Sequence, residues 1–230
     1  MQINEIFSSI EGEGIRTGYL ATFIRTFGCN LSCSYCDTKY ACTVDPNEQD
    51  QFTVMSVEEI VARVDELRNF KVTLTGGEPL IQRDAPELVA ALLEAGYEVN
   101  IETNGAVELA PFEDKLVDVL SDDALLKNLI YTMDYKCPSS GEEAKMIKSN
   151  IPFLIEGDVL KFVVGNTEDL NAMKAVLDEY EPQAEIFVSP VWGEIEGKDI
   201  VQYMKDNDLQ KVRVQVQLHK IFWDVNQRGV

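Results

Sequence analysis

The chain has 230 residues, of which 45% are apolar and 26% are charged. Twenty basic and 40 acidic residues give a net charge of −20, so nucleic acid and anionic membranes would repel its surface. This apolar content excludes wholesale disorder, and the length suffices for a core without disulfides. No apolar run approaches the roughly 18 residues of a membrane span, and the N-terminus lacks the segments of a signal peptide. We therefore expect a cytoplasmic protein that binds neither nucleic acid nor membranes.

Apolar patterns predict strands that alternate with helices along the chain. In chain order, the predicted elements are a strand over Ala21–Phe27, a helix from Val57 to Leu67, a strand over Lys71–Thr75, a helix around Leu88–Leu93, strands over Val99–Glu102, Leu129–Met133 and Val159–Val164, a helix over Asp169–Tyr180, a strand over Ile186–Val188, a helix over Ile200–Lys205 and a strand over Val212–Leu218. The segments Ala106–Asn128 and Cys137–Gly157 are hard to assign. Such alternation implies a parallel sheet, so we expect one α/β domain over residues 1–230, a partial (β/α) barrel.

Three of the five cysteines form a cluster directly after the first predicted strand. Cys29, Cys33 and Cys36 lie within eight residues, with three and then two residues between them. A short loop with this spacing can turn three thiolates towards one centre, and thiolates suit iron–sulfur clusters or zinc. A cubane cluster held by three cysteines keeps one iron open for a substrate.

Zinc is the alternative occupant of this loop. A structural zinc ion needs a fourth ligand, and the candidates are Cys42, Cys137 and His219. None of these residues stands at a typical zinc spacing from the loop, and no second Cys-x-x-Cys pairs with it. The spacing therefore favours the open cluster.

The cysteine loop resembles the signature of the radical S-adenosylmethionine superfamily, with Cys-x3-Cys-x2-Cys after the first strand of a partial barrel. Tyr35 adds to the resemblance as the aromatic residue before the third cysteine. A second signal is Thr75-Gly76-Gly77-Glu78-Pro79, which follows the next predicted strand. In the superfamily such a segment holds the amino group of the methionine moiety.

Further segments narrow the resemblance to one family. The order of these segments resembles that of the 7-carboxy-7-deazaguanine synthase family. They are Ile10-Glu11-Gly12-Glu13-Gly14, Arg25, the loop Cys29–Thr38, Thr75–Pro79 and Glu102-Thr103-Asn104-Gly105. The resemblance covers nearly the whole chain. It implies a carbon–nitrogen lyase with a reduced barrel that acts in 7-deazapurine (queuosine) biosynthesis.

The resemblance assigns roles residue by residue. It implies cluster ligation by Cys29, Cys33 and Cys36, and Mg²⁺ ligation by Thr38. It implies substrate binding by Ile10, Glu11, Gly12, Glu13, Arg25, Thr75 and the terminal carboxylate of Val230. It implies S-adenosylmethionine contacts by Tyr35, Cys36, Asp37, Gly77, Asp134, Tyr135, Lys136, Ser189, Pro190, Val191 and Trp192. This chain departs from the family in having Glu11 where Gln is common and Asp134-Tyr135 where Ser-Pro is usual.

The implied reaction converts 6-carboxy-5,6,7,8-tetrahydropterin to 7-carboxy-7-deazaguanine and ammonia. The resemblance implies three cofactors: a [4Fe-4S] cluster, S-adenosylmethionine and Mg²⁺. It also implies a flavodoxin- or ferredoxin-like electron donor and a homodimeric assembly. The residue types agree, since Arg25 can bind a substrate carboxylate bidentately and Glu13 can accept from a pterin edge.

From the sequence alone, purely structural roles for these residues and other functions for the protein remain open. Taken alone, Arg25 fits a surface strand residue as well as a site residue. The structural role is favoured for Thr38, as a loop cap, and for His219, as a strand-end side chain with a satisfied hydrogen bond. An activating enzyme for a glycyl-radical protein would use the same cluster. A zinc-stabilised module without catalysis and a simple electron carrier are further alternatives.

Overall fold

The computed structural model describes residues 1–46, 51–224 and 227–230, so part of the polar loop between 43 and 53 lies outside the described residues. Within these residues, nine strands form one sheet: β1 (Gln2–Ile10), β2 (Leu20–Thr26), β3 (Thr53–Val54), β4 (Lys71–Gly76), β5 (Glu98–Thr103), β6 (Leu129–Lys136), β7 (Val159–Val164), β8 (Glu185–Pro190) and β9 (Val212–Val214). Their order in the sheet is β3-β1-β2-β4-β5-β6-β7-β8-β9. From β2 to β9 neighbouring strands are parallel, whereas β1 is antiparallel to β2 and β3.

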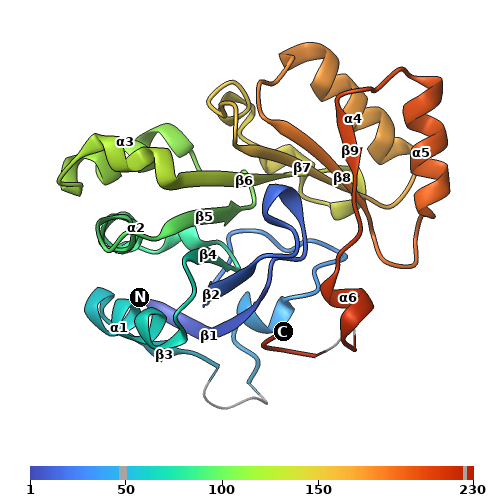
Figure 1. Ribbon diagram of the computed structural model, residues 1–230. Helices are drawn as coiled ribbons and strands as arrows, with labels where there is room; N and C mark the ends of the chain where they lie inside the picture. Colours follow the sequence, from blue (N-terminus) through green and yellow to red (C-terminus); the bar gives the residue numbers. More distant parts are fainter. Residues whose placement is uncertain (47–50, 225–226) are drawn as a thin grey trace.

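Helices connect the parallel strands and pack on the outside of the curved sheet (Figure 1). The α-helices are α1 (Val57–Leu67), α2 (Ala85–Glu94), α3 (Leu109–Val119), α4 (Thr167–Tyr180), α5 (Gly197–Asp206) and α6 (His219–Phe222). The sheet does not close, because β3 and β9 are its two edges. The architecture is therefore the expected α/β partial barrel.

Alternation along the strands separates an apolar face from a polar one. On the face covered by helices, each strand buries apolar residues such as Ile24, Leu74, Ile101, Met133, Phe162 and Val188. Leu92, Leu116 and Met173 supply the helix side of this core. The residues between them along the strands point to the concave face, where the polar side chains of the sheet gather.

Most predicted elements are confirmed within a few residues. The capping box at the start of α1 is present, with Ser56 accepting from the Glu59 amide and the Glu59 side chain accepting from the Ser56 amide. The strand predicted over Val212–Leu218 ends at Val214, so its second half was wrong. Beyond Val214 the Gln215 amide still donates to the Val188 carbonyl, and the side chains of Gln215 and Gln217 donate to Glu13.

Among the described residues, two strands and two α-helices had no sequence prediction: β1, β3, α3 and α6. β1 carries polar residues at inward and outward positions alike, so no clear period of two appears in its sequence. α3 lies in the segment that was hard to assign, with three buried residues spaced as on one helix face, Leu109, Phe112 and Leu116.

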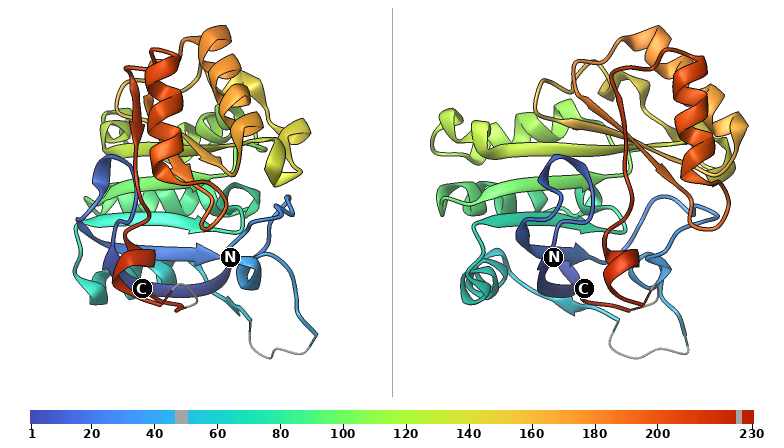
Figure 2. Two further views of the ribbon diagram at one scale, coloured as in Figure 1. Left: turned by 90° about the vertical axis from the view of Figure 1, so that its right-hand side faces the viewer. Right: turned by 45° about the vertical axis from the view of Figure 1, so that its right-hand side comes forward.

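The connection between β1 and β2 spans the open side of the barrel. The Gly14 amide donates to Gln215 Oε1 at 2.7 Å, and the Leu218 amide donates to the Gly12 carbonyl at 3.2 Å. Figure 2 shows the C-terminal segment running back along this side towards β1. The loop between β1 and β2 and the C-terminal segment are thus hydrogen-bonded across the side that strand pairing closes in a complete barrel. Within the described residues, no helix is long and apolar enough to cross a membrane.

Candidate functional site

Polar side chains of adjacent strands lie side by side on the concave face. The register pairs Arg25 with Thr75, and the Thr75 hydroxyl donates to Glu102 at 2.8 Å. Farther along the sheet the register pairs Asp134 with Lys161, and Val163 with Ser189. Apart from Lys161, which is the third residue of β7, these positions lie in the C-terminal halves of their strands, the edge at which barrel folds build their sites.

The cysteine loop follows β2 at the same edge and is held by residues distant in sequence. Ser32 donates its amide to Glu142 at 2.9 Å, and Ser34 donates its amide to the Ser140 carbonyl at 3.0 Å. Asn30 donates its side-chain amide to the Ala106 carbonyl at 3.0 Å. The loop therefore has a fixed path that the sequence motif alone does not specify.

The thiols of this loop fit an iron–sulfur cluster. Cys29, Cys33 and Cys36 are all partly exposed, so they can face a bound group. Among the described residues, no three His, Cys, Asp or Glu side chains gather to hold a single metal ion. A closed structural zinc site would need such a group, whereas the cysteines of a cluster bind different irons.

Neighbouring donors favour the thiolate form that iron requires. Hydrogen bonding from Cys42 holds the pKa of Cys29 and Cys36 down to about 6, although burial opposes it. Cys29 Sγ also accepts from the Leu31 amide at 3.4 Å and the Asn104 side chain at 3.6 Å. Hydrogen bonds to ligand sulfurs are a recognised feature of cluster sites.

The segment after β4 approaches the cysteine loop very closely. A Cβ on Gly77 would lie 2.3 Å from the Gly28 carbonyl oxygen and 2.9 Å from Cys29 Cβ. The Glu78 amide donates to the same carbonyl at 2.9 Å. Only glycine at position 77 permits this contact, as the Gly-Gly pair in the sequence suggested.

Glu78 joins three segments of the site and was missed by the sequence analysis. Its fully buried carboxylate accepts from the Asn104 amide at 2.7 Å, the Leu80 amide at 3.0 Å and the Thr103 hydroxyl at 3.0 Å. Burial raises the pKa of Glu78 to about 7, against the effect of these donors. The position of Glu and Asn directly after predicted strands was the available signal.

The remaining residues of the cysteine loop face the sheet or the returning tail. Tyr35 donates its hydroxyl to the Val163 carbonyl at 3.4 Å, and Asp37 pairs with Lys220 at 2.9 Å. Thr38 Oγ1 lies 3.7 Å from Cys36 Sγ. Thr38 precedes a short 3₁₀ turn, but its side chain makes no capping hydrogen bond to that turn. The structure therefore does not support a loop-capping role for Thr38.

Glu11 is buried on the concave face. It accepts from the Thr73 hydroxyl and lies 3.5 Å from Arg16 Nε. Burial and the nearby Glu102 carboxylate raise the pKa of Glu11 to about 7, while Arg16 and Thr73 lower it. A carboxyl in this environment can carry a proton near neutral pH and so can donate a hydrogen bond.

Arg25 is held by a carboxylate that the sequence analysis did not single out. Its Nε donates to Glu5 at 2.7 Å, and its guanidinium packs near the Phe7 and Tyr40 rings. The chain end reaches the same place, since a Cβ on Gly229 would lie 3.8 Å from Glu5 Oε2. Val230, next in sequence, is therefore near Arg25 although no contact of its carboxylate is recorded among the described residues.

Lys161 connects the other predicted site residues. Its Nζ lies 3.2 Å from Glu13 and 3.0 Å from Asp134, and Asp134 also pairs with Lys136 at 2.6 Å. Ser189 donates to Glu13 at 2.8 Å. The predicted substrate-binding segment and the predicted cofactor-binding segments are thus brought together, through a lysine that the sequence analysis passed over as part of an apolar strand.

Other predicted residues lie around this centre or farther from it. Ile10 ends β1, and Gly12 packs so closely on His219 that a Cβ would lie 2.9 Å from Nδ1. His219 is therefore at the substrate-binding segment, where burial lowers its pKa against the effect of Glu13 and Asp37. Tyr135 points into the core, and after β8 Val191 is buried whereas Trp192 is 57% exposed.

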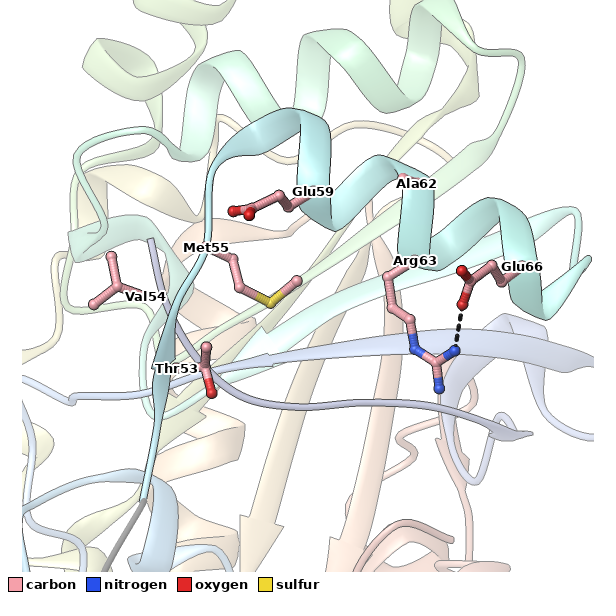
Figure 3. Close-up of a pocket in the computed structure, with 7 residues that line it drawn as sticks. All are labelled: Thr53, Val54, Met55, Glu59, Ala62, Arg63 and Glu66. Atoms are coloured by element: carbon pink, nitrogen blue, oxygen red, sulfur yellow. Dashed lines mark hydrogen bonds and ion pairs between the residues drawn. The ribbon is translucent and has the colours of Figure 1, made fainter.

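The pocket in Figure 3 is a separate surface. It has a volume of about 450 Å³ and is lined by residues of β3, α1 and the turn between them, including Met55, Glu59 and Arg63. No predicted site residue lines it. We place the functional site at the concave face because the polar residues and the cysteine loop converge there.

Comparisons with known proteins identify relatives along the whole chain. A family model described as "Radical SAM superfamily" matches residues 23–124. The 7-carboxy-7-deazaguanine synthase of Clostridium acetobutylicum is 44% identical over 234 residues, covering 100% of this chain and 99% of the relative. The enzyme of the same name from Methanospirillum hungatei is 42% identical over 224 residues, covering 96% of this chain and 84% of the relative. The solved structure titled "Crystal structure of QueE from Escherichia coli" has a TM-score of 0.70 at 24% identity, covering 94% of this chain and 93% of that one.

Proposed function

This chain belongs to the 7-carboxy-7-deazaguanine synthase family of radical S-adenosylmethionine enzymes, and on that premise we propose which of its residues perform the reaction. The enzyme is a lyase that converts 6-carboxy-5,6,7,8-tetrahydropterin to 7-carboxy-7-deazaguanine with loss of ammonia. The named relatives favour this activity over a glycyl-radical activating enzyme, an electron carrier or a zinc module.

The assignment of the cluster site rests on the contacts of the cysteine loop with Gly77 and Asn104. Cys29, Cys33 and Cys36 would hold a [4Fe-4S] cluster. When bound, the cluster and S-adenosylmethionine supply the electron transfer and hydrogen abstraction of the reaction. The chain's own part is to present three thiols to the cluster. The donors around Cys29 and Cys36 favour their thiolates, whereas burial raises the pKa of Cys33.

The cofactor is proposed to lie along the ends of β4, β6 and β8. Gly77 leaves room for close approach to the backbone, and Tyr35 and Asp37 border the same space from the cysteine loop. Asp134, Lys136 and Ser189 present polar side chains there, and Trp192 stands at its rim. These residues orient the cofactor and exclude water from the reacting atoms.

The substrate is proposed to lie against the segment Ile10–Glu13 and the row Arg25, Thr75 and Glu102. Arg25 would bind the substrate carboxylate through the guanidinium edge that Glu5 does not occupy. Thr75 and the protonatable carboxyl of Glu11 offer donors to a pterin edge. The terminal carboxylate of Val230 would approach from the returning tail.

Thr38 is proposed to ligate Mg²⁺ together with substrate oxygens, since Mg²⁺ prefers oxygen ligands and retains waters. Its hydroxyl is uncommitted to a cap and stands beside Cys36, next to both proposed ligand sites.

We predict that EDTA lowers turnover without bleaching the cluster and that added Mg²⁺ restores it. Thr38→Ala should have lower activity and a weaker response to Mg²⁺, and Thr38→Ser should be milder because the hydroxyl remains. Mg²⁺ titrations of all three proteins at matched iron content measure this. Identical Mg²⁺ dependence in the wild type and Thr38→Ala would contradict the ligand assignment.

The partners and setting are carried over from the family resemblance. We propose a homodimer that receives electrons from a flavodoxin- or ferredoxin-like protein in the cytoplasm. The five unbridged cysteines suit a reducing compartment. Analytical ultracentrifugation measures the oligomeric state directly.

Turnover itself tests the proposed function. Protein reconstituted anaerobically with iron and sulfide is incubated with the tetrahydropterin, S-adenosylmethionine, Mg²⁺ and a chemical reductant, and the products are identified by mass spectrometry. We expect 7-carboxy-7-deazaguanine and ammonia from the wild type and neither from Cys33→Ala. Wild-type protein that carries the cluster but forms no deazaguanine product would overturn the assignment.

A further inference from the structure

A single charged residue interrupts the apolar strand β7. Its sequence is Val159-Leu160-Lys161-Phe162-Val163-Val164, and Lys161 is only 7% exposed. An ammonium group buried without partners would be very costly, so its partners determine why it is there. The register places it on the concave face, opposite Asp134 of β6.

The partners of Lys161 come from two different parts of the site. Glu13 lies on the connection between β1 and β2, which is proposed to bind the substrate, and Asp134 belongs to the proposed cofactor-binding segment. The ammonium lies 3.2 Å from Glu13 Oε2 and 3.0 Å from Asp134 Oδ1. Lys136 neutralises the second oxygen of Asp134 at 2.6 Å, so two cations and two anions balance within the network.

Glu13 is engaged on both of its oxygens. Oε1 accepts from Ser189 at 2.8 Å and Gln215 at 3.2 Å, and Oε2 accepts from Gln217 at 3.4 Å in addition to Lys161. An ionised carboxylate offers about four acceptor positions, so these four donors account for its capacity. The side chain of Glu13 thus fixes the substrate-binding segment to β7, β8 and the tail.

We propose that Lys161 is a positioning residue that couples the substrate site to the cofactor site. The inference rests on the proposed function for the identity of the two ligands. A ligand that orders Asp134 also orders Lys161 and, through it, Glu13. The second ligand then meets a segment already in place, so its own binding costs less ordering.

Binding measurements without turnover test this coupling. The affinity of the tetrahydropterin is measured by equilibrium dialysis on anaerobic, unreduced, cluster-containing protein, with and without saturating S-adenosylmethionine. In the wild type we expect S-adenosylmethionine to tighten substrate binding by about 5-fold or more. In Lys161→Met the ratio should fall close to one. The control Lys174→Met removes a half-exposed lysine paired with Asp178 and should keep the wild-type ratio.

A second variant keeps the test decisive if Lys161→Met does not fold. Glu13→Gln leaves the pair of Lys161 and Asp134 intact, so Lys161 keeps one anionic partner. Its neutral amide loses the ion pair with Lys161 and has one acceptor oxygen where the carboxylate has two, so the coupling ratio should fall as well.

Either of two results would overturn the proposal: a wild-type ratio of one, or a wild-type ratio retained by both Lys161→Met and Glu13→Gln. These outcomes differ from a failure of the proposed function, which would appear as absence of product in the wild-type turnover assay.

Discussion

Individual side chains in the cysteine loop have distinct environments despite their proximity in sequence. Cys42 Sγ lies 3.9 Å from Cys36 Sγ, yet Cys42 stands outside the three-cysteine motif. Its thiol donates to the neighbouring sulfurs, which raises its own pKa and keeps it protonated. Cys42 is therefore a close neighbour of the proposed cluster ligands, and it makes a sharper control than the buried Cys137.

We predict that Cys29→Ala, Cys33→Ala and Cys36→Ala each lose the cluster, because each removes one of three iron ligands. Cys42→Ala and Cys137→Ala should retain it. Iron content and visible absorbance after anaerobic reconstitution measure the outcome. If Cys42→Ala lost iron as completely as Cys33→Ala, the site would have four cysteine ligands and no open iron.

Arg25 is a second residue whose role follows from its immediate contacts. Glu5 occupies Nε of its guanidinium and orients the group towards the concave face, beside Thr75. Burial opposes the charge on Arg25, but Tyr40 and Glu5 outweigh it and raise its pKa. Like other arginines, Arg25 is therefore a cation near neutral pH.

We predict that Arg25→Ala weakens tetrahydropterin binding on the order of 10- to 100-fold, the loss of a charge-assisted hydrogen bond of roughly 1.5–3 kcal/mol. Arg25→Lys should be intermediate, because it keeps the charge but loses the fork. Glu5→Gln leaves the guanidinium in place and should change affinity less than Arg25→Ala. Equilibrium dialysis compares the variants, and unchanged binding by Arg25→Ala would remove Arg25 from the site.

At the level of elements, the site depends on how closely β4 and the cysteine loop approach each other. Gly77 meets the Gly28 carbonyl, and Glu78 holds the ends of β4 and β5 together through Asn104 and Thr103. The connections after β2, β4 and β5 therefore form one hydrogen-bonded unit. A change in one of them is expected to disturb the others.

We predict that Gly77→Ala destabilises the protein by about 1–3 kcal/mol, because the added Cβ overlaps backbone that cannot move without displacing Cys29. Cluster retention should fall with it. The matched control is Gly197→Ala at the start of α5, where nothing lies within 4 Å of the added Cβ and alanine favours the helix. Urea unfolding and iron content measure both variants. Equal stability of the two variants would show that the close approach is relaxed in solution.

The whole molecule carries a net charge of −20 in a single compact sheet-and-helix body. Three of its 20 basic residues lie on the concave face with acidic partners: Arg25, Lys136 and Lys161. The remaining acidic excess is spread over the exterior and repels itself. Such repulsion disfavours the folded state and is screened by salt.

We predict that raising NaCl from about 10 mM to about 300 mM increases the melting temperature of the cluster-free protein, by about 2–4 °C for each kcal/mol of repulsion removed. The buried ion pairs are screened much less and should not reverse the trend. Circular dichroism melts at constant pH measure it, and KCl serves as the control for a specific ion effect. A melting temperature that falls with salt would mean that surface ion pairs outweigh the repulsion.

The order of strands and helices and the identity of the cysteine loop were available from the sequence by itself. They depend on local patterns: buried strands such as β7, the capping box of α1, and the spacing of Cys29, Cys33 and Cys36. The family resemblance rested on the same short segments, and the relatives confirm it. Local patterns suffice there because each is complete within a few residues.

Contacts between distant segments were decided by the tertiary structure alone. Lys161 and Glu13 are 148 residues apart, and Glu5, Glu78 and Asn104 acquire their roles only when the strand ends meet. The role of a charged residue within an apolar strand cannot be inferred until its partners are known. The segment beyond Val214 also makes contacts that its sequence does not specify, since Gln215 and Gln217 donate to Glu13 across the open side of the barrel.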